Sequence, residues 1–136
     1  MSIALSMLLV MLAAPAAPPE AAKEETFADA LKAAKDTWAT AEGKAYDDAL
    51  VASVTDQYDD AISTCIEANK SPDVASFQVV AKIDANGAVT KTLTQPETEV
   101  AKCFASNVKE IKYPKPPKAN QWILIDMRRS DGQPGK

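Results

Sequence analysis

Cys65 and Cys103 are the only cysteines in the chain, and a disulfide bond between them is the clearest chemistry that the sequence offers. The chain has no histidine, so Ser-His-Asp and Cys-His catalytic arrangements are excluded. Two sulfurs without histidine also make a poor zinc site. The alternative to a disulfide is a pair of free thiols that are buried as small apolar side chains.

The acidic residues give no better case for catalysis or metal binding. The pairs Asp47-Asp48 and Asp59-Asp60 are adjacent, and neighbours on a helix point about 100° apart, so both pairs are interpreted as solvated. Asp84-x-Asn86-Gly87 is similar to the start of a calcium loop but lacks the later ligands and the distal glutamate. We therefore expect no catalytic residue, no metal and no cofactor.

The charge of the chain argues against nucleic acid as a partner. The net charge is −4 and the pI is about 4.8, whereas a protein that binds the phosphate backbone presents a basic face. The one concentration of lysines lies beside Glu110 in a Pro-rich stretch and is interpreted as a solvated edge. Its members are Lys109, Lys112, Lys115 and Lys118.

The N-terminus carries the features of an export signal. Residues 3–14 are apolar and uncharged but too short to span a bilayer as a helix, and Ala14-Pro15-Ala16 fits an A-x-A cleavage site. Residues 1–16 are therefore interpreted as a signal peptide, although no Lys or Arg precedes the apolar run and the true start could lie upstream. An uncleaved anchor is the alternative. Export to the bacterial periplasm or the medium would suit a disulfide, and membrane contact would end at cleavage.

A single domain is expected over residues 26–127, between a flexible lead-in at 17–25 and a disordered tail at 128–136. Apolar residues at helical spacing predict a first helix over 26–41, which Gly43 is expected to interrupt. A second row runs from Tyr46 towards Cys65, as one long helix or as two with a break near residues 53–55. Residues 69–73 form a stop signal.

Residues 77–84 and 88–94 are expected to form a β-hairpin. Apolar side chains alternate at Phe77, Val79, Ala81 and Ile83, with Val80 out of phase. A two-residue turn at Asn86-Gly87 would split the apolar residues between two faces. A three-residue loop, 85–87, with Gly87 at positive φ, places Ile83 opposite Val89 and Val79 opposite Leu93, which makes one apolar face and is preferred.

A helix follows the hairpin, and a third strand follows the helix. Thr94 or Gln95 is expected to cap the helix, with Pro96 at its first position. The buried stripe of this helix includes Cys103, so both cysteines face inward from helices on one sheet face. Gln121 to Met127 is expected to be a strand. The connections then require an antiparallel sheet of order 2-1-3 in an α+β fold of the form ααββαβ.

Residues 58–127 resemble the TonB C-terminal domain family, and specifically its Cys-paired, TonB-like branch of bacterial envelope proteins. The resemblance rests on the order of Tyr58…Ile62…Cys65, the hairpin with Asp84-x-Asn86-Gly87, Val100…Cys103-Phe104 and Lys112-Tyr113-Pro114-x-Pro116. It implies a non-catalytic periplasmic domain that binds an extended segment of an envelope protein by strand addition. The corresponding edge would comprise Gln121, Trp122, Ile123, Leu124 and Ile125.

Two other interpretations remain open. The chain could be a small disulfide-stapled secreted inhibitor or immunity-type protein, in which case a protruding loop is expected at the Asn86-Gly87 turn or the Pro-rich connector 113–118. The edge at 121–127 could instead be covered by the N-terminal helix through Trp38, in which case no peptide site would exist.

Overall fold

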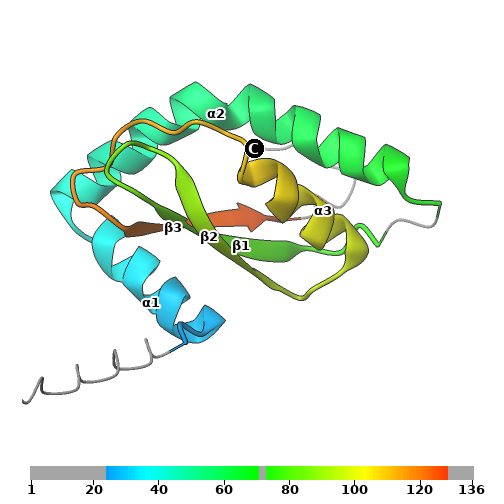
Figure 1. Ribbon diagram of the computed structural model, residues 1–136, viewed down its shortest axis with the longest axis horizontal. Helices are drawn as coiled ribbons and strands as arrows, with labels where there is room; N and C mark the ends of the chain where they lie inside the picture. The colour runs from blue at the N-terminus through cyan, green and yellow to red at the C-terminus, as the bar shows by residue number, and fades with distance from the viewer. Residues whose placement is uncertain (1–23, 71–72, 129–136) are drawn as a thin grey trace, which may run out of the picture.

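The computed structural model describes residues 24–70 and 73–128 (Figure 1), so the expected signal peptide, nearly all of the lead-in and residues 129–136 lie outside the described residues. The chain is α+β, and its three strands form one antiparallel sheet of order β2-β1-β3, which confirms the predicted fold class and topology. The elements are α1 (Phe27–Trp38), α2 (Ala41–Ala68), β1 (Phe77–Ile83), β2 (Val89–Gln95), α3 (Glu99–Val108) and β3 (Gln121–Met127).

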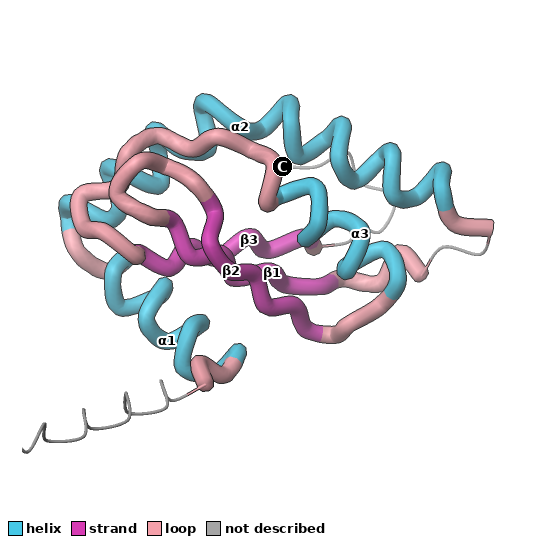
Figure 2. The backbone as a smooth tube through the Cα atoms, in the orientation of Figure 1, coloured by secondary structure: helices cyan, strands magenta, loops and turns pink. Residues whose placement is uncertain are grey.

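Helices cover both faces of the sheet, with α2 on one side of the strands and α1 on the other (Figure 2). The larger core joins Val79 and Ile83 of β1 to Leu50 of α2 and Phe104 of α3. The smaller core joins Val80 and Trp122 to Ala34 of α1. Val80, which breaks the apolar alternation of β1, is therefore fully buried under α1.

The corner between α1 and α2 lies at Ala39-Thr40. Gly43, which was expected to interrupt the first helix, belongs instead to the first turn of α2, so that expectation is wrong. The Thr40 hydroxyl accepts a hydrogen bond from the Gly43 amide at 3.0 Å and so caps α2. A β-carbon at Gly43 would collide with the carbonyl oxygen of Thr37, so glycine is needed for the close approach of the two helices. From Ala41, α2 runs as one helix to Ala68.

The hairpin has the expected three-residue loop, but its register departs from the expected one. Gly87 has a φ of 86°, and Ile83 pairs with Val89. A bulge then shifts the register, so that Leu93 pairs with Val80 rather than with Val79 as expected. The bulge adds one residue to β2, which turns Val89 towards the larger core and Leu93 towards the smaller core.

Helix α3 begins later than expected. Gln95 is still part of β2, and the N-cap is Thr98, whose hydroxyl accepts from the Ala101 amide at 3.1 Å; neither Thr94 nor Gln95 caps, and Pro96 lies before the helix. Extended backbone at Thr98 gives the geometry that a capping hydroxyl requires.

Cys65 and Cys103 form the predicted disulfide bond, which joins α2 to α3. Their Cα atoms are 5.7 Å apart, and the Cys65 side chain is fully buried. The Asn107 side-chain amide donates to the Cys65 sulfur at 3.3 Å. The disulfide therefore fastens the two helices that cover the larger core.

Candidate functional site

The edge of β3 is the first part of the candidate site. The sheet order places β2 and β3 at the two edges, and within the described residues β1 is the only strand that pairs with β3. β2 carries polar residues such as Thr90, Lys91 and Thr92, whereas β3 carries Trp122, Ile123 and Leu124 in succession. The β3 edge is thus the more apolar of the two, and its outward backbone groups can pair with another strand.

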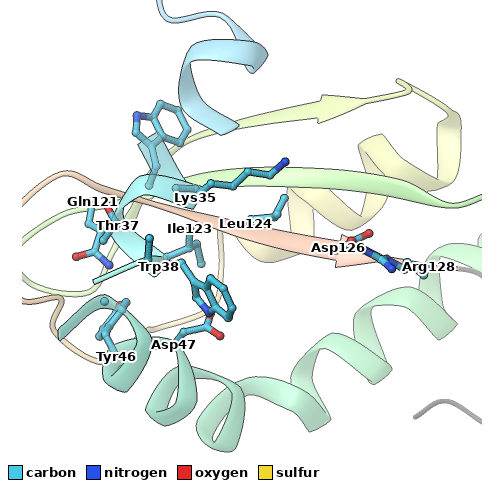
Figure 3. Close-up of a pocket in the computed structure, with 14 residues that line it drawn as sticks. Lys35, Thr37, Trp38, Tyr46, Asp47, Gln121, Ile123, Leu124, Asp126 and Arg128 are labelled. Atoms are coloured by element: carbon cyan, nitrogen blue, oxygen red, sulfur yellow. Dashed lines mark hydrogen bonds and ion pairs between the residues drawn. The ribbon is translucent and has the colours of Figure 1, made fainter. Parts of the chain in front are cut away.

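A groove with a volume of about 620 Å³ runs along this edge (Figure 3). We call it the β3 groove. Its walls come from three elements: Ala34 and Trp38 of α1, Tyr46 and Asp47 of α2, and Gln121 to Leu124 of β3. Its size is in the range of sites that bind small molecules or side chains of a peptide.

Side chains from both faces of β3 line the β3 groove. Trp122 and Leu124 belong to the α1 side of the sheet, and Ile123 belongs to the side covered by α2. Successive side chains of a strand point to opposite faces, so a groove that reaches both sets must pass around the strand edge. The groove therefore reaches the first four residues of β3, although Gln121, Trp122 and Ile123 are themselves largely buried.

Trp38 stands at the end of α1 and lines the groove without closing it. Its side chain lies between β3 and α2 (Figure 3), and the residue is 54% exposed. The Lys44 ammonium lies 5.9 Å from the centre of the Trp38 ring. The rest of α1 packs mainly against β3, through Trp122 and Leu124, so the alternative in which this helix covers the edge stays a prediction.

Asp47 provides one of the two carboxylates that line the groove, and the other, Asp126, is paired with Arg128. Burial raises the pKa of the Asp47 carboxyl, while a hydrogen bond from the Trp38 side chain lowers it and the neighbouring Asp48 raises it further. In the described part of the chain no Lys or Arg forms an ion pair with Asp47. Asp47 is half-buried and Asp48 is exposed, so of the two residues that were expected to be solvated alike, only Asp48 is.

Gln121 adds a second acceptor. This residue is only 7% exposed, and its Oε1 atom is buried without a hydrogen-bond partner. A buried polar atom in this state is unusual, because most such atoms have a protein or water partner. Gln121 lines the β3 groove, but its Oε1 atom is shielded from solvent, so a donor in the groove reaches this atom only once the side chain rotates.

A group of tyrosines fixes the start of α2 against the chain that leads into β3. The Tyr46 hydroxyl donates to the Pro114 carbonyl at 2.8 Å, and the hydroxyls of Tyr58 and Tyr113 are 2.8 Å apart. Burial raises the pKa of Tyr46 and of Tyr113 to about 12, and it raises the pKa of Tyr58 as well. These contacts position the groove walls and offer no nucleophile at neutral pH.

The two loops that an inhibitor would present contact each other, while Asn86 of the turn and residues 117–120 at the end of the connector are exposed. Gly87 is buried, and its carbonyl accepts from the Tyr113 amide at 2.9 Å, so the Asn86-Gly87 turn is attached to the Pro-rich connector. Asp84 closes the turn from inside, since its carboxylate accepts from the amides of Ala88 and Asn86. The backbone amides of Ala88 and Asn86 hold the pKa of Asp84 below its usual value.

Over residues 24–70 and 73–128, no cluster of three or more potential metal ligands occurs. No helix in the same ranges has the length and hydropathy to cross a membrane. At the start of α1, Glu25 pairs with Lys82 at 2.8 Å, so the last residue of the expected lead-in is held against the sheet.

The structure brings together residues that the sequence suggested separately. Gln121 to Leu124 were expected at a binding edge, and all four line the groove, whereas Ile125, which was also expected there, does not. Trp38 was considered only as a cover, and Asp47 was not considered a site residue. The one feature of the sequence that could have indicated a wall of the groove was the apolar stripe of residues 27–38, because a helix with such a stripe must pack on the second face of the sheet.

Comparisons of the chain with models of protein families, with curated proteins and with solved structures found no match.

Proposed function

We propose that this chain is a non-catalytic interaction module that binds an extended segment of a partner protein by strand addition to β3. The observation that carries the proposal is the β3 groove, which reaches side chains of both faces of an edge strand without a second strand partner in the described residues. In strand addition, main-chain hydrogen bonds provide affinity, and pockets for alternate side chains provide specificity. The β3 edge offers the backbone groups, and the β3 groove offers space for side chains.

The resemblance of residues 58–127 to the TonB C-terminal domain family supports the same proposal. In that family an extended segment of an outer-membrane transporter is held at a sheet edge, and the resemblance implies that β3 is the corresponding strand. The partner that we propose is accordingly an envelope protein with an extended segment.

We place the protein outside the cytoplasm, in the periplasm or secreted. The disulfide between Cys65 and Cys103 supports this placement, because structural disulfides persist in oxidising compartments. The apolar run and A-x-A site near the N-terminus support it from the sequence.

The test is selection of peptides from a random phage-displayed library against the full chain, produced by export so that the disulfide forms. Selected peptides are then titrated into isotope-labelled protein, and amide chemical shifts are followed. We expect the largest shifts in Gln121–Met127 and slower hydrogen exchange for the outward amides of that strand. Selected peptides that shift other elements, or a library that yields no binder, would contradict the proposal.

A matched pair of variants controls for the position of the site. Ala39 is exposed and lines the β3 groove, whereas Ala52 is exposed on α2 and does not. We expect Ala39→Trp to obstruct the groove and weaken peptide binding, and Ala52→Trp to leave it unchanged. Equal affinities for both variants would place the peptide elsewhere.

A further inference from the structure

Two side chains that line the β3 groove, Gln121 and Asp47, present hydrogen-bond acceptors. Gln121 presents a buried Oε1 atom without a partner, and Asp47 presents a half-buried carboxylate without a cation. The indole of Trp38 offers its donor to Asp47. An occupant that completes this groove must therefore supply donors.

The other charges that line the groove do not neutralise Asp47. Arg128 is paired with Asp126, with 2.8 Å between its Nε atom and the carboxylate. Lys35 is exposed in the last turn of α1. Lys44 does not line the groove and lies over the Trp38 ring. The carboxylate of Asp47 is therefore the half-buried charge of the groove that lacks an opposite charge in the described part of the chain.

Trp38 supplies an apolar surface beside that carboxylate. Figure 3 shows its ring between β3 and α2, with Asp47 next to it on α2. A Lys or Arg side chain can lay its methylene groups on such a ring while its charged end reaches a carboxylate. Trp38 and Asp47 together form a surface of this kind.

We propose that the segment bound at β3 carries a Lys or Arg side chain that crosses Trp38 and pairs with Asp47. The Oε1 atom of Gln121 accepts a hydrogen bond from the same segment. This inference rests on the proposed function and specifies its ligand as a basic extended peptide. A charged pair in a half-buried groove discriminates strongly, because an acidic or neutral residue would leave Asp47 desolvated and unpaired.

The test uses the phage library described above, with selection on the wild type, on Asp47→Asn and on Asp48→Asn. The two variants remove the same charge from adjacent residues, but only Asp47 lines the groove. We expect enrichment of Lys or Arg at one position with the wild type and with Asp48→Asn, and loss of that enrichment with Asp47→Asn. The best peptide is then synthesised with its basic residue or with norleucine, and we expect norleucine to weaken binding to the wild type about tenfold.

The outcomes separate this inference from the function on which it rests. Selected peptides that shift β3 amides but are neutral or acidic would overturn the basic ligand and leave strand addition standing. Equal loss of binding in Asp47→Asn and Asp48→Asn would show general charge attraction and would also overturn the proposed pair. Peptides that never shift β3 amides would overturn both proposals.

Discussion

The backbone of Tyr113 lies directly against Gly87. The Tyr113 amide donates to the Gly87 carbonyl at 2.9 Å, and a β-carbon at Gly87 would collide with the Tyr113 carbonyl oxygen. Two segments that are far apart in the sequence, the hairpin turn and the connector before β3, are thereby joined through a residue without a side chain.

We predict that Gly87→Ala lowers the free energy of unfolding by at least about 2 kcal/mol. Positive φ alone costs a residue with a β-carbon about 1–2 kcal/mol, and the collision with Tyr113 adds to this cost. Ala85→Val in the same loop is the control and is expected to change stability little, because Ala85 is exposed. Urea unfolding of both variants checks this, and equal midpoints would refute the tight contact.

We predict that Gly43→Ala destabilises the protein even though Gly43 lies in a helix. Replacement of a helical glycine by alanine ordinarily stabilises a protein by about 1 kcal/mol. At this position the added methyl group would meet the Thr37 carbonyl and separate α1 from α2. Ala45→Gly, at an exposed position of the same turn, is expected to cost about 1 kcal/mol. A gain of stability in Gly43→Ala would show that the corner is looser than described.

We predict that Cys65→Ser and Cys103→Ser each lower the free energy of unfolding by about 3–4 kcal/mol, because the disulfide closes a loop with a sequence separation of 38. The double variant should resemble the single ones. Thiol titration and intact mass, with and without reductant, verify the bond in the exported protein. An unchanged melting temperature in both single variants would remove the structural role of the bond.

We predict that Gln121→Leu stabilises the free protein by about 1 kcal/mol, because it removes a buried acceptor without a partner. The same change should weaken peptides that bind at β3, since their donor loses the Oε1 atom. Gln57→Leu on an exposed part of α2 is the control and should alter neither quantity. Loss of stability in Gln121→Leu would mean that the amide is satisfied in solution.

We predict that stability falls as the pH rises above 10. All three tyrosines have a raised pKa in the folded protein, so above pH 10 the unfolded chain has lost protons that the folded chain retains, and unfolding is favoured. Absorbance near 295 nm (a tyrosinate signal) should remain low at pH 10.5 in the folded protein and rise in denaturant. Tyrosinate at pH 10.5 without denaturant would contradict the buried tyrosine contacts.

The sequence predicted the parts of the fold that follow from local patterns and from connectivity. The hairpin loop at 85–87, the inward cysteines and the 2-1-3 order all follow from alternation, helical spacing and strand direction. The position of Leu93 could not be predicted in this way, because the bulge in β2 places Val89 in the larger core and Leu93 in the smaller one. Val80 was the residue that could have indicated the second core.

The candidate site was predictable as a strand but not as a groove. Apolar residues in succession identified β3, whereas the groove depends on the angle at which α1 meets α2 beside it. Gly43 allows α2 to approach Thr37 of α1 closely. The spacing of apolar residues along the sequence does not indicate such a contact. Asp47 therefore could not be distinguished from Asp48 before the helices were placed.

The difference between the two sheet edges has a consequence for the protein without its partner. β2 is protected against sheet extension by threonines and a lysine, whereas β3, a strand of the same length, presents an apolar run. Two copies can satisfy each other's β3 edge in place of a ligand. We therefore expect concentrated samples to self-associate reversibly, and a bound peptide to act as a solubilising agent that keeps the chain monomeric.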